Sequence, residues 1–146
     1  MFVVVVGCGR VGSALARELA DEGHEVSVVD ESAEAFERLG DGFPGTFVEG
    51  PALEVSVLEA AGIERADAFV AATNGDNTNI VIAQVARDRY QVPCVVVRVL
   101  DPNRAKFYEA RGLTTICPTA TAISLIGSAV RGYAETLGSS FDGGAG

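Results

Sequence analysis

The sequence predicts an α/β fold: a doubly wound parallel sheet of six strands, covered by helices on both faces to make three layers. Two observations lead to this prediction. Runs of apolar, β-branched residues alternate along the chain with stretches of helical character. Most of these runs are continuous rather than alternating in polarity, which is typical of strands buried on both faces of a parallel sheet. Right-handed crossovers through the helices then complete the fold.

The predicted strands alternate with helices that begin at recognisable capping residues. The strands cover residues 2–6, 26–30, 46–49, 68–73, 95–100 and 114–117. The first helix places Val11, Leu15 and Leu19 on one face and ends at Gly23. The next four helices are predicted to begin at Ser32, at Pro51, at Asn74 or Asp76, and at Asp101-Pro102.

A sixth helix is expected after the last strand, from Thr119 or Thr121 to about Leu137. Residues 138–146, GSSFDGGAG, are rich in glycine and lack periodicity, so we expect a flexible tail there. Residues 1–137 are predicted to form one domain, because a chain of 146 residues has the length of a single domain with a real core.

The stretch VVVVGCGRVGSAL, residues 3–15, joins the first strand to the first helix. In it, Gly7 allows a tight turn, Gly9 leaves room for a pyrophosphate, and Gly12 lets the helix pack close to the strand. The start of the helix offers free amides and the positive end of its dipole to phosphates. The pattern indicates a Rossmann-type nucleotide-binding domain; the alternative is a tight turn with no ligand.

Asp30 ends the second predicted strand and is expected to accept hydrogen bonds from ribose hydroxyls. Its charge repels a 2′-phosphate, and no arginine follows directly to reverse that preference, since the next residues are Glu31-Ser32-Ala33. The expected cofactor is therefore NAD(H), ADP or ATP rather than NADP(H). The alternative role for Asp30 is a helix N-cap, which Ser32 is also able to supply.

Several other functions conflict with the composition. The net charge of −9 opposes nucleic acid as a main partner. No apolar run approaches the ~20 residues of a membrane-spanning helix, so the chain is not expected to insert into a membrane. The cysteines match no metal-binding spacing, and no metal site is expected.

No catalytic residues are assigned. The single histidine, His24, is placed at a turn on the side of the sheet opposite the nucleotide crevice, and no serine or cysteine nucleophile has a histidine partner. We therefore predict a nucleotide sensor rather than an enzyme. The alternative is the cofactor-binding domain of an NAD-dependent dehydrogenase, which would need a second domain to hold its substrate.

Five motifs occur in a characteristic order along the chain: VVGCGRVGSALA, the acidic Asp30, LEAAGIERADAFVAATNGDNTNIVIAQVAR, VVVRVLDP and ICPTATA. In these motifs, residues 1–137 resemble the N-terminal, nucleotide-binding lobe of the RCK/KTN domains. Such domains regulate Trk/Ktr-type potassium uptake systems and some potassium channels. The resemblance implies a cytoplasmic regulatory subunit that binds NAD(H), ADP or ATP and gates a membrane potassium transporter or channel. It would lie at the inner membrane through that partner.

The resemblance also implies which residues bind the nucleotide. Gly7, Gly9, Arg10, Val11 and Gly12 would form the phosphate loop, with Arg10 reaching phosphates in its own or a neighbouring subunit. Arg10 is otherwise a solvated residue at the helix start. Further candidates lie after later strands: Asp30, Glu31, Thr73, Asn74 and Arg98.

Three of these candidates have an alternative structural role. Thr73 and Asn74 are alternatively helix caps. Arg98, a charge in an apolar run, is alternatively half of an ion pair.

Gly50-Pro51 stands where the family usually has Gly-Asp. A side chain that would meet the adenosine end of the nucleotide is therefore missing, and Pro51 has no N–H to donate.

The sixth predicted helix carries an apolar stripe at helical spacing: Ile123, Ile126, Val130, Tyr133 and Leu137. Such a stripe belongs either to the core or to an interface. The resemblance implies that this helix crosses to a neighbouring subunit. We therefore expect a homodimer, or a larger ring with the membrane partner, assembled through the sixth helix.

Overall fold

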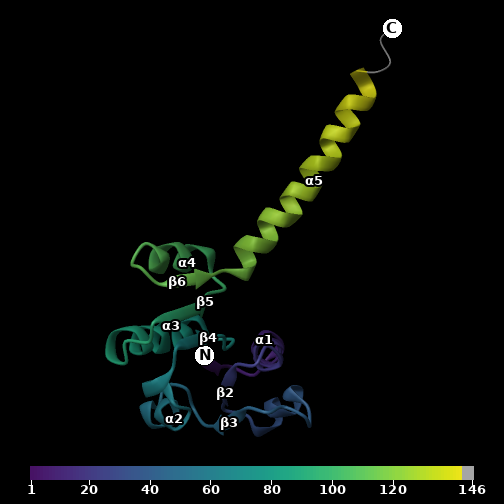
Figure 1. Cartoon of the computed structure of the whole chain (residues 1–146). Coiled ribbons are helices and arrows are strands. Elements are labelled where there is room, and N and C mark those ends of the chain that lie inside the picture. Colours follow the sequence, from purple (N-terminus) through teal and green to yellow (C-terminus); the bar gives the residue numbers. More distant parts are fainter. Residues whose placement is uncertain (143–146) are drawn as a thin grey trace.

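The computed structural model describes residues 1–142. One six-stranded sheet in the order β3-β2-β1-β4-β5-β6 lies at its centre, and every neighbouring pair of strands is parallel. Helices cover both faces of this sheet (Figure 1), which confirms the predicted Rossmann-type, three-layer fold. The strands are β1 (Phe2–Val6), β2 (Glu25–Asp30), β3 (Thr46–Glu49), β4 (Ala68–Ala71), β5 (Cys94–Arg98) and β6 (Thr114–Ile116).

The alternation of side chains along β1 divides the core into two layers. Val3 and Val5 pack with the buried residues of α1 (Arg10–Asp21) and η1 (Ala33–Leu39). Phe2, Val4 and Val6 face the second layer. That layer contains α2 (Val55–Ala60), η2 (Ile63–Arg65), α3 (Asp76–Gln84), η3 (Val85–Arg89) and α4 (Pro102–Glu109). Continuous burial of β1 explains why its sequence is an unbroken valine run.

Some helices differ from the expectation. Helix η1 is a 3₁₀ helix, and its buried Phe36 and Leu39 lie three residues apart, which is the repeat of that helix. Helix α3 is capped by Gly75 rather than by Asn74 or Asp76, and it continues into a π-helical turn, η3. Asp101 caps α4 as predicted and accepts hydrogen bonds from the amides of the first helical turn.

Helix α5 (Pro118–Asp142) extends away from the sheet and its covering helices (Figure 1). It passes beyond Leu137, so the first part of the predicted tail is helical; residues 143–146 of that tail lie outside the described residues. The apolar stripe is not core: Ile123 is 64% exposed and Val130 65% exposed. Across residues 1–142, no helix is both long and apolar enough to span a membrane.

Candidate functional site

A pocket of about 510 Å³ opens at the carboxyl edge of the sheet. Strands β1 and β4 are neighbours there. From β1 the sheet is extended in one direction by β2, and from β4 it is extended in the opposite direction by β5. Such a reversal of strand order is where doubly wound sheets bind ligands. Of the predicted site residues, this pocket brings together Gly7, Gly9, Asp30, Glu31, Thr73 and Asn74.

The glycines between β1 and α1 have different structural roles. Gly7 has a φ of +104°, and a Cβ on it would lie 2.5 Å from the carbonyl oxygen of Ala72. A Cβ on Gly12 would lie 1.7 Å from the carbonyl oxygen of Gly7, so Gly12 lets α1 pack under the loop. A Cβ on Gly9 would meet nothing within 4 Å. Gly9 therefore leaves open space in the pocket wall, where a phosphate is able to approach the backbone.

Asp30 connects the glycine loop to the end of β2. Its Oδ2 accepts a 2.8 Å hydrogen bond from the amide of Cys8, and its Oδ1 accepts one of 2.8 Å from the amide of Ser32. Ser32 occupies the N-cap position of η1, but its side chain makes no capping bond. A carboxylate oxygen has two lone pairs and is able to accept a second hydrogen bond. Asp30 can therefore also accept hydrogen bonds from a ligand in the pocket.

Cys8, the residue between the first two glycines of the loop, is fully buried. Its Sγ donates to the carbonyl of Ala35 at 3.2 Å, which fixes the loop to η1. Burial, and then the nearby charge of Asp30, raises the pKa of the Cys8 thiol, and Arg38 and Arg17 only partly oppose that shift. The protonated thiol is therefore favoured, and Cys8 packs as a small apolar residue.

Four predicted site residues lie outside the pocket lining in the part of the chain that the structure describes: Arg10, Val11, Gly12 and Arg98. Arg10 and Val11 are exposed at the start of α1. The Nη2 of Arg98 donates to the carbonyls of Ala72 at 3.1 Å and Thr73 at 2.7 Å. The same nitrogen lies 3.4 Å from the Oδ1 of Asn74. The partners of Arg98 are therefore neutral oxygens just after β4, and not the carboxylate that an ion pair requires.

Asn79, on α3, was not predicted from the sequence as a site residue. It is fully buried, and its Oδ1 accepts from the amide of Thr73 at 2.9 Å and from the Thr73 hydroxyl at 2.6 Å. Its Nδ2 donates to the carbonyls of Thr73 and Arg98, each at 2.9 Å. Thr73 is thus held by Asn79 at the pocket wall, and it does not cap α3. Local sequence gives no signal for this role, since it depends on contacts with β4 and β5.

The loop after β3 also reaches the pocket. Gly50 lines it, and its amide donates a 3.0 Å hydrogen bond to the carbonyl of Asp30. Because Gly50 has no side chain and Pro51 no N–H, this wall offers a ligand few polar groups. Within residues 1–142, no cluster of histidine, cysteine and carboxylate side chains has the arrangement of a metal site.

The model of the TrkA-N domain family matches residues 3–118. The chain belongs to this family. Its sequence is 47% identical over 116 residues to the Trk system potassium uptake protein TrkA of Streptomyces coelicolor, covering 80% of this chain and 52% of that protein. It is 36% identical over 141 residues to the Mycobacterium tuberculosis TrkA of the strain H37Rv, covering 89% of this chain and 60% of that one. This TrkA-N domain thus spans about half the length of the curated relatives that it matches.

A solved structure also resembles this TrkA-N domain. The C-terminal domain of Kef from Shewanella denitrificans, in an AMP-bound form, superposes with a TM-score of 0.70 at 26% identity. The match covers 97% of this chain and 93% of that one. The resemblance to a TrkA-N lobe, expected from the motifs, is therefore confirmed.

Proposed function

We propose that this domain binds an adenine nucleotide, namely NAD(H), ADP or ATP, in the pocket between β1, β2 and β4. The observation that carries the proposal is the arrangement of the glycine loop and Asp30 around one open space. The loop leaves Gly9 open for phosphates, and Asp30 offers a carboxylate to the ribose. The AMP-bound form of the similar Kef domain supports an adenosine ligand.

We further propose that the domain is the regulatory part of a potassium transport system. Its relatives are named Trk system potassium uptake proteins, which supports a cytoplasmic subunit held at the inner membrane by a transporter or channel. The exposed stripe on α5 supports assembly into a homodimer or larger ring. A nucleotide that binds one subunit arrangement better than another would shift the assembly towards it, and the membrane partner would respond to that shift.

A regulatory role accounts for the chain better than catalysis does. The only histidine, His24, lies before β2 at the amino edge of the sheet, where its Nε2 is 3.8 Å from Glu22. The pocket lies at the opposite, carboxyl edge. A dehydrogenase cofactor domain remains the second candidate, and turnover of NAD⁺ with a small hydroxy acid would favour it.

Calorimetric titration tests the proposed ligand. The wild-type chain is titrated separately with NAD⁺, NADH, NADP⁺, ADP and ATP under one buffer and salt condition. We expect at least one of NAD(H), ADP or ATP to bind, and NADP⁺ to bind about tenfold more weakly because Asp30 and Glu31 repel its 2′-phosphate. Equal affinities for NAD⁺ and NADP⁺ would contradict the assignment, and so would the absence of binding by every nucleotide.

A further inference from the structure

Arg38 lines the candidate nucleotide pocket, although it was not predicted from the sequence as a site residue. It belongs to η1, well after Asp30 in the chain, yet it lines the same pocket as the glycine loop and Asp30. Its Nη1 lies 3.4 Å from the carbonyl oxygen of Cys8, within the glycine loop. That distance is long for a charged hydrogen bond, so the guanidinium is held weakly and is free to exchange this carbonyl for a stronger acceptor.

Arg38 differs in charge from the other ionisable residues that line the pocket. Asp30 and Glu31 bring two carboxylates to the wall that would meet the ribose hydroxyls. Among the described residues that line the pocket, Arg38 alone has a positive side chain. The loop arginine Arg10 is exposed on α1, and Arg98 is bound to the carbonyls of Ala72 and Thr73 and does not itself line the pocket. An anionic ligand in this pocket therefore has one lining cation to meet.

We propose that Arg38 binds the 5′-phosphate of the adenine nucleotide and makes the site select phosphorylated ligands over adenosine. This inference rests on the proposed nucleotide function. The guanidinium contacts the loop residue that directly precedes Gly9, where the approach to the backbone is open. The pocket thus has a cation beside the stretch of backbone that a phosphate approaches, and a guanidinium binds a phosphate through its fork of N–H donors.

Calorimetry with adenosine, 5′-AMP and 2′-AMP tests this role in the wild type, Arg38→Gln and Arg38→Lys. We expect Arg38→Gln to weaken 5′-AMP about tenfold and to leave adenosine within about twofold, because only the phosphate contact is lost. Arg38→Lys should recover part of the 5′-AMP affinity, since the charge is kept while the planar fork is lost. The affinity for 5′-AMP should also fall with added salt less steeply in Arg38→Gln than in the wild type.

Arg17→Gln is the matched control. Arg17 lies on α1 near Cys8 and carries the same charge, but it lines a different surface hollow. An equal loss of 5′-AMP affinity in Arg17→Gln would assign the effect to net charge and overturn the role of Arg38. Equal losses for adenosine and 5′-AMP in Arg38→Gln, or a loss confined to 2′-AMP, would overturn it too. A wild type that binds none of these three ligands, and none of NAD⁺, NADH, NADP⁺, ADP and ATP, would overturn the nucleotide function itself.

Discussion

The amide of Cys8 donates a 2.8 Å hydrogen bond to the Oδ2 of Asp30, across the gap between the glycine loop and the end of β2. The other carboxylate oxygen, Oδ1, holds the amide of Ser32 at the same distance. One side chain therefore fixes the positions of two loops that line the pocket. The residue expected to bind ribose therefore also holds the loops of the pocket in position.

This double role predicts the effect of Asp30→Ala. The substitution leaves the amides of Cys8 and Ser32 without their acceptor, so we expect the free energy of unfolding to fall by about 1–3 kcal/mol. Affinity for ADP should fall as well. Urea denaturation and calorimetry measure the two effects. Glu31→Ala is the control, since Glu31 is exposed in the same pocket; its change in unfolding free energy should stay within about 0.5 kcal/mol. Equal stability of the two variants would contradict the role of Asp30.

The glycines of the loop predict opposite outcomes for two matched substitutions. Gly12→Ala places a methyl group 1.7 Å from the carbonyl of Gly7, and we expect this variant to be largely unfolded. Gly9→Ala meets nothing within 4 Å, so its melting temperature should stay within a few degrees of wild type, about 1 kcal/mol or less of stability. Its affinity for ADP should nevertheless fall, because the methyl group fills the space beside the backbone. A Gly9→Ala variant that binds normally would show that the phosphates lie elsewhere.

Asn79 predicts a large stability effect at a position away from the pocket surface. Asn79→Ala removes the acceptor of the Thr73 amide and the Nδ2 donor to the Arg98 carbonyl, so we expect a loss of about 3 kcal/mol in the free energy of unfolding. Asn77→Ala, two residues earlier on the exposed side of α3, loses one exposed hydrogen bond from Arg104 and should cost about 1 kcal/mol or less. Chemical denaturation of both variants measures the difference. Similar losses at the two positions would show that the contacts of Asn79 contribute little.

Strand β1 was predictable because burial on both faces requires a continuous apolar run, and the run at residues 2–6 matches it end to end. The prediction at residues 46–49 also matches β3 end to end, although this edge strand is largely exposed. The glycine loop was predictable because Gly7 and Gly12 occupy positions where a side chain would clash, and Gly9 completes the same spaced pattern. Asn79 and Arg38 were not, since their partners lie on other elements and leave no local pattern. The extension of α5 was missed because Gly138 and Ser139 are weak helix formers, yet the helix continues through them.

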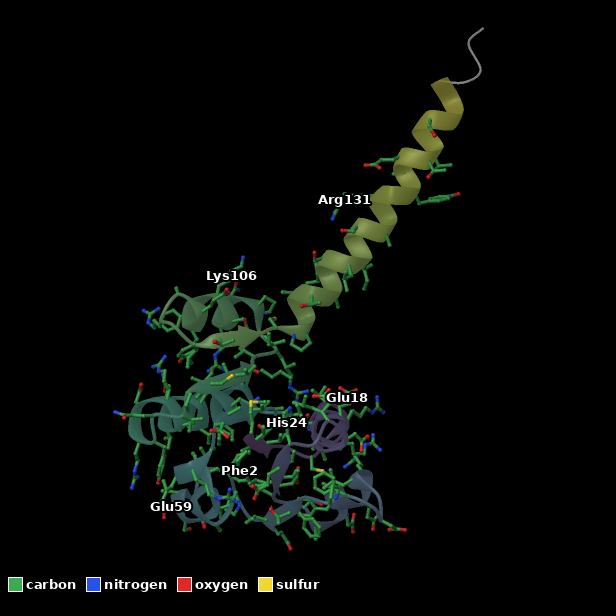
Figure 2. All side chains as sticks on the ribbon, in the orientation of Figure 1. Phe2, Glu18, His24, Glu59, Lys106 and Arg131 are labelled. Atoms are coloured by element: carbon green, nitrogen blue, oxygen red, sulfur yellow. The ribbon has the colours of Figure 1, made fainter. Side chains whose placement is uncertain are left out.

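The last prediction concerns the stripe on α5. Figure 2 shows side chains, Arg131 among them, projecting on both sides of α5, which extends away from the sheet. The stripe residues are between 46% and 66% exposed, and an apolar surface of this length is typical of an interface with another chain. We therefore expect the wild type to sediment as a homodimer or larger assembly at concentrations on the order of tens of micromolar.

A matched pair of double variants tests that interface. Ile126→Asp with Val130→Asp puts two charges into the stripe, whereas Ser124→Asp with Ser128→Asp puts two charges on the opposite side of the same helix turns. We expect the first pair to sediment as a monomer and the second to match wild type. With ADP present, both double variants should have the melting temperature of the wild type, because α5 contributes no residue to either layer of the core. A wild type that remains monomeric with ADP present would remove the interface and, with it, the proposed way in which nucleotide binding reaches the membrane partner.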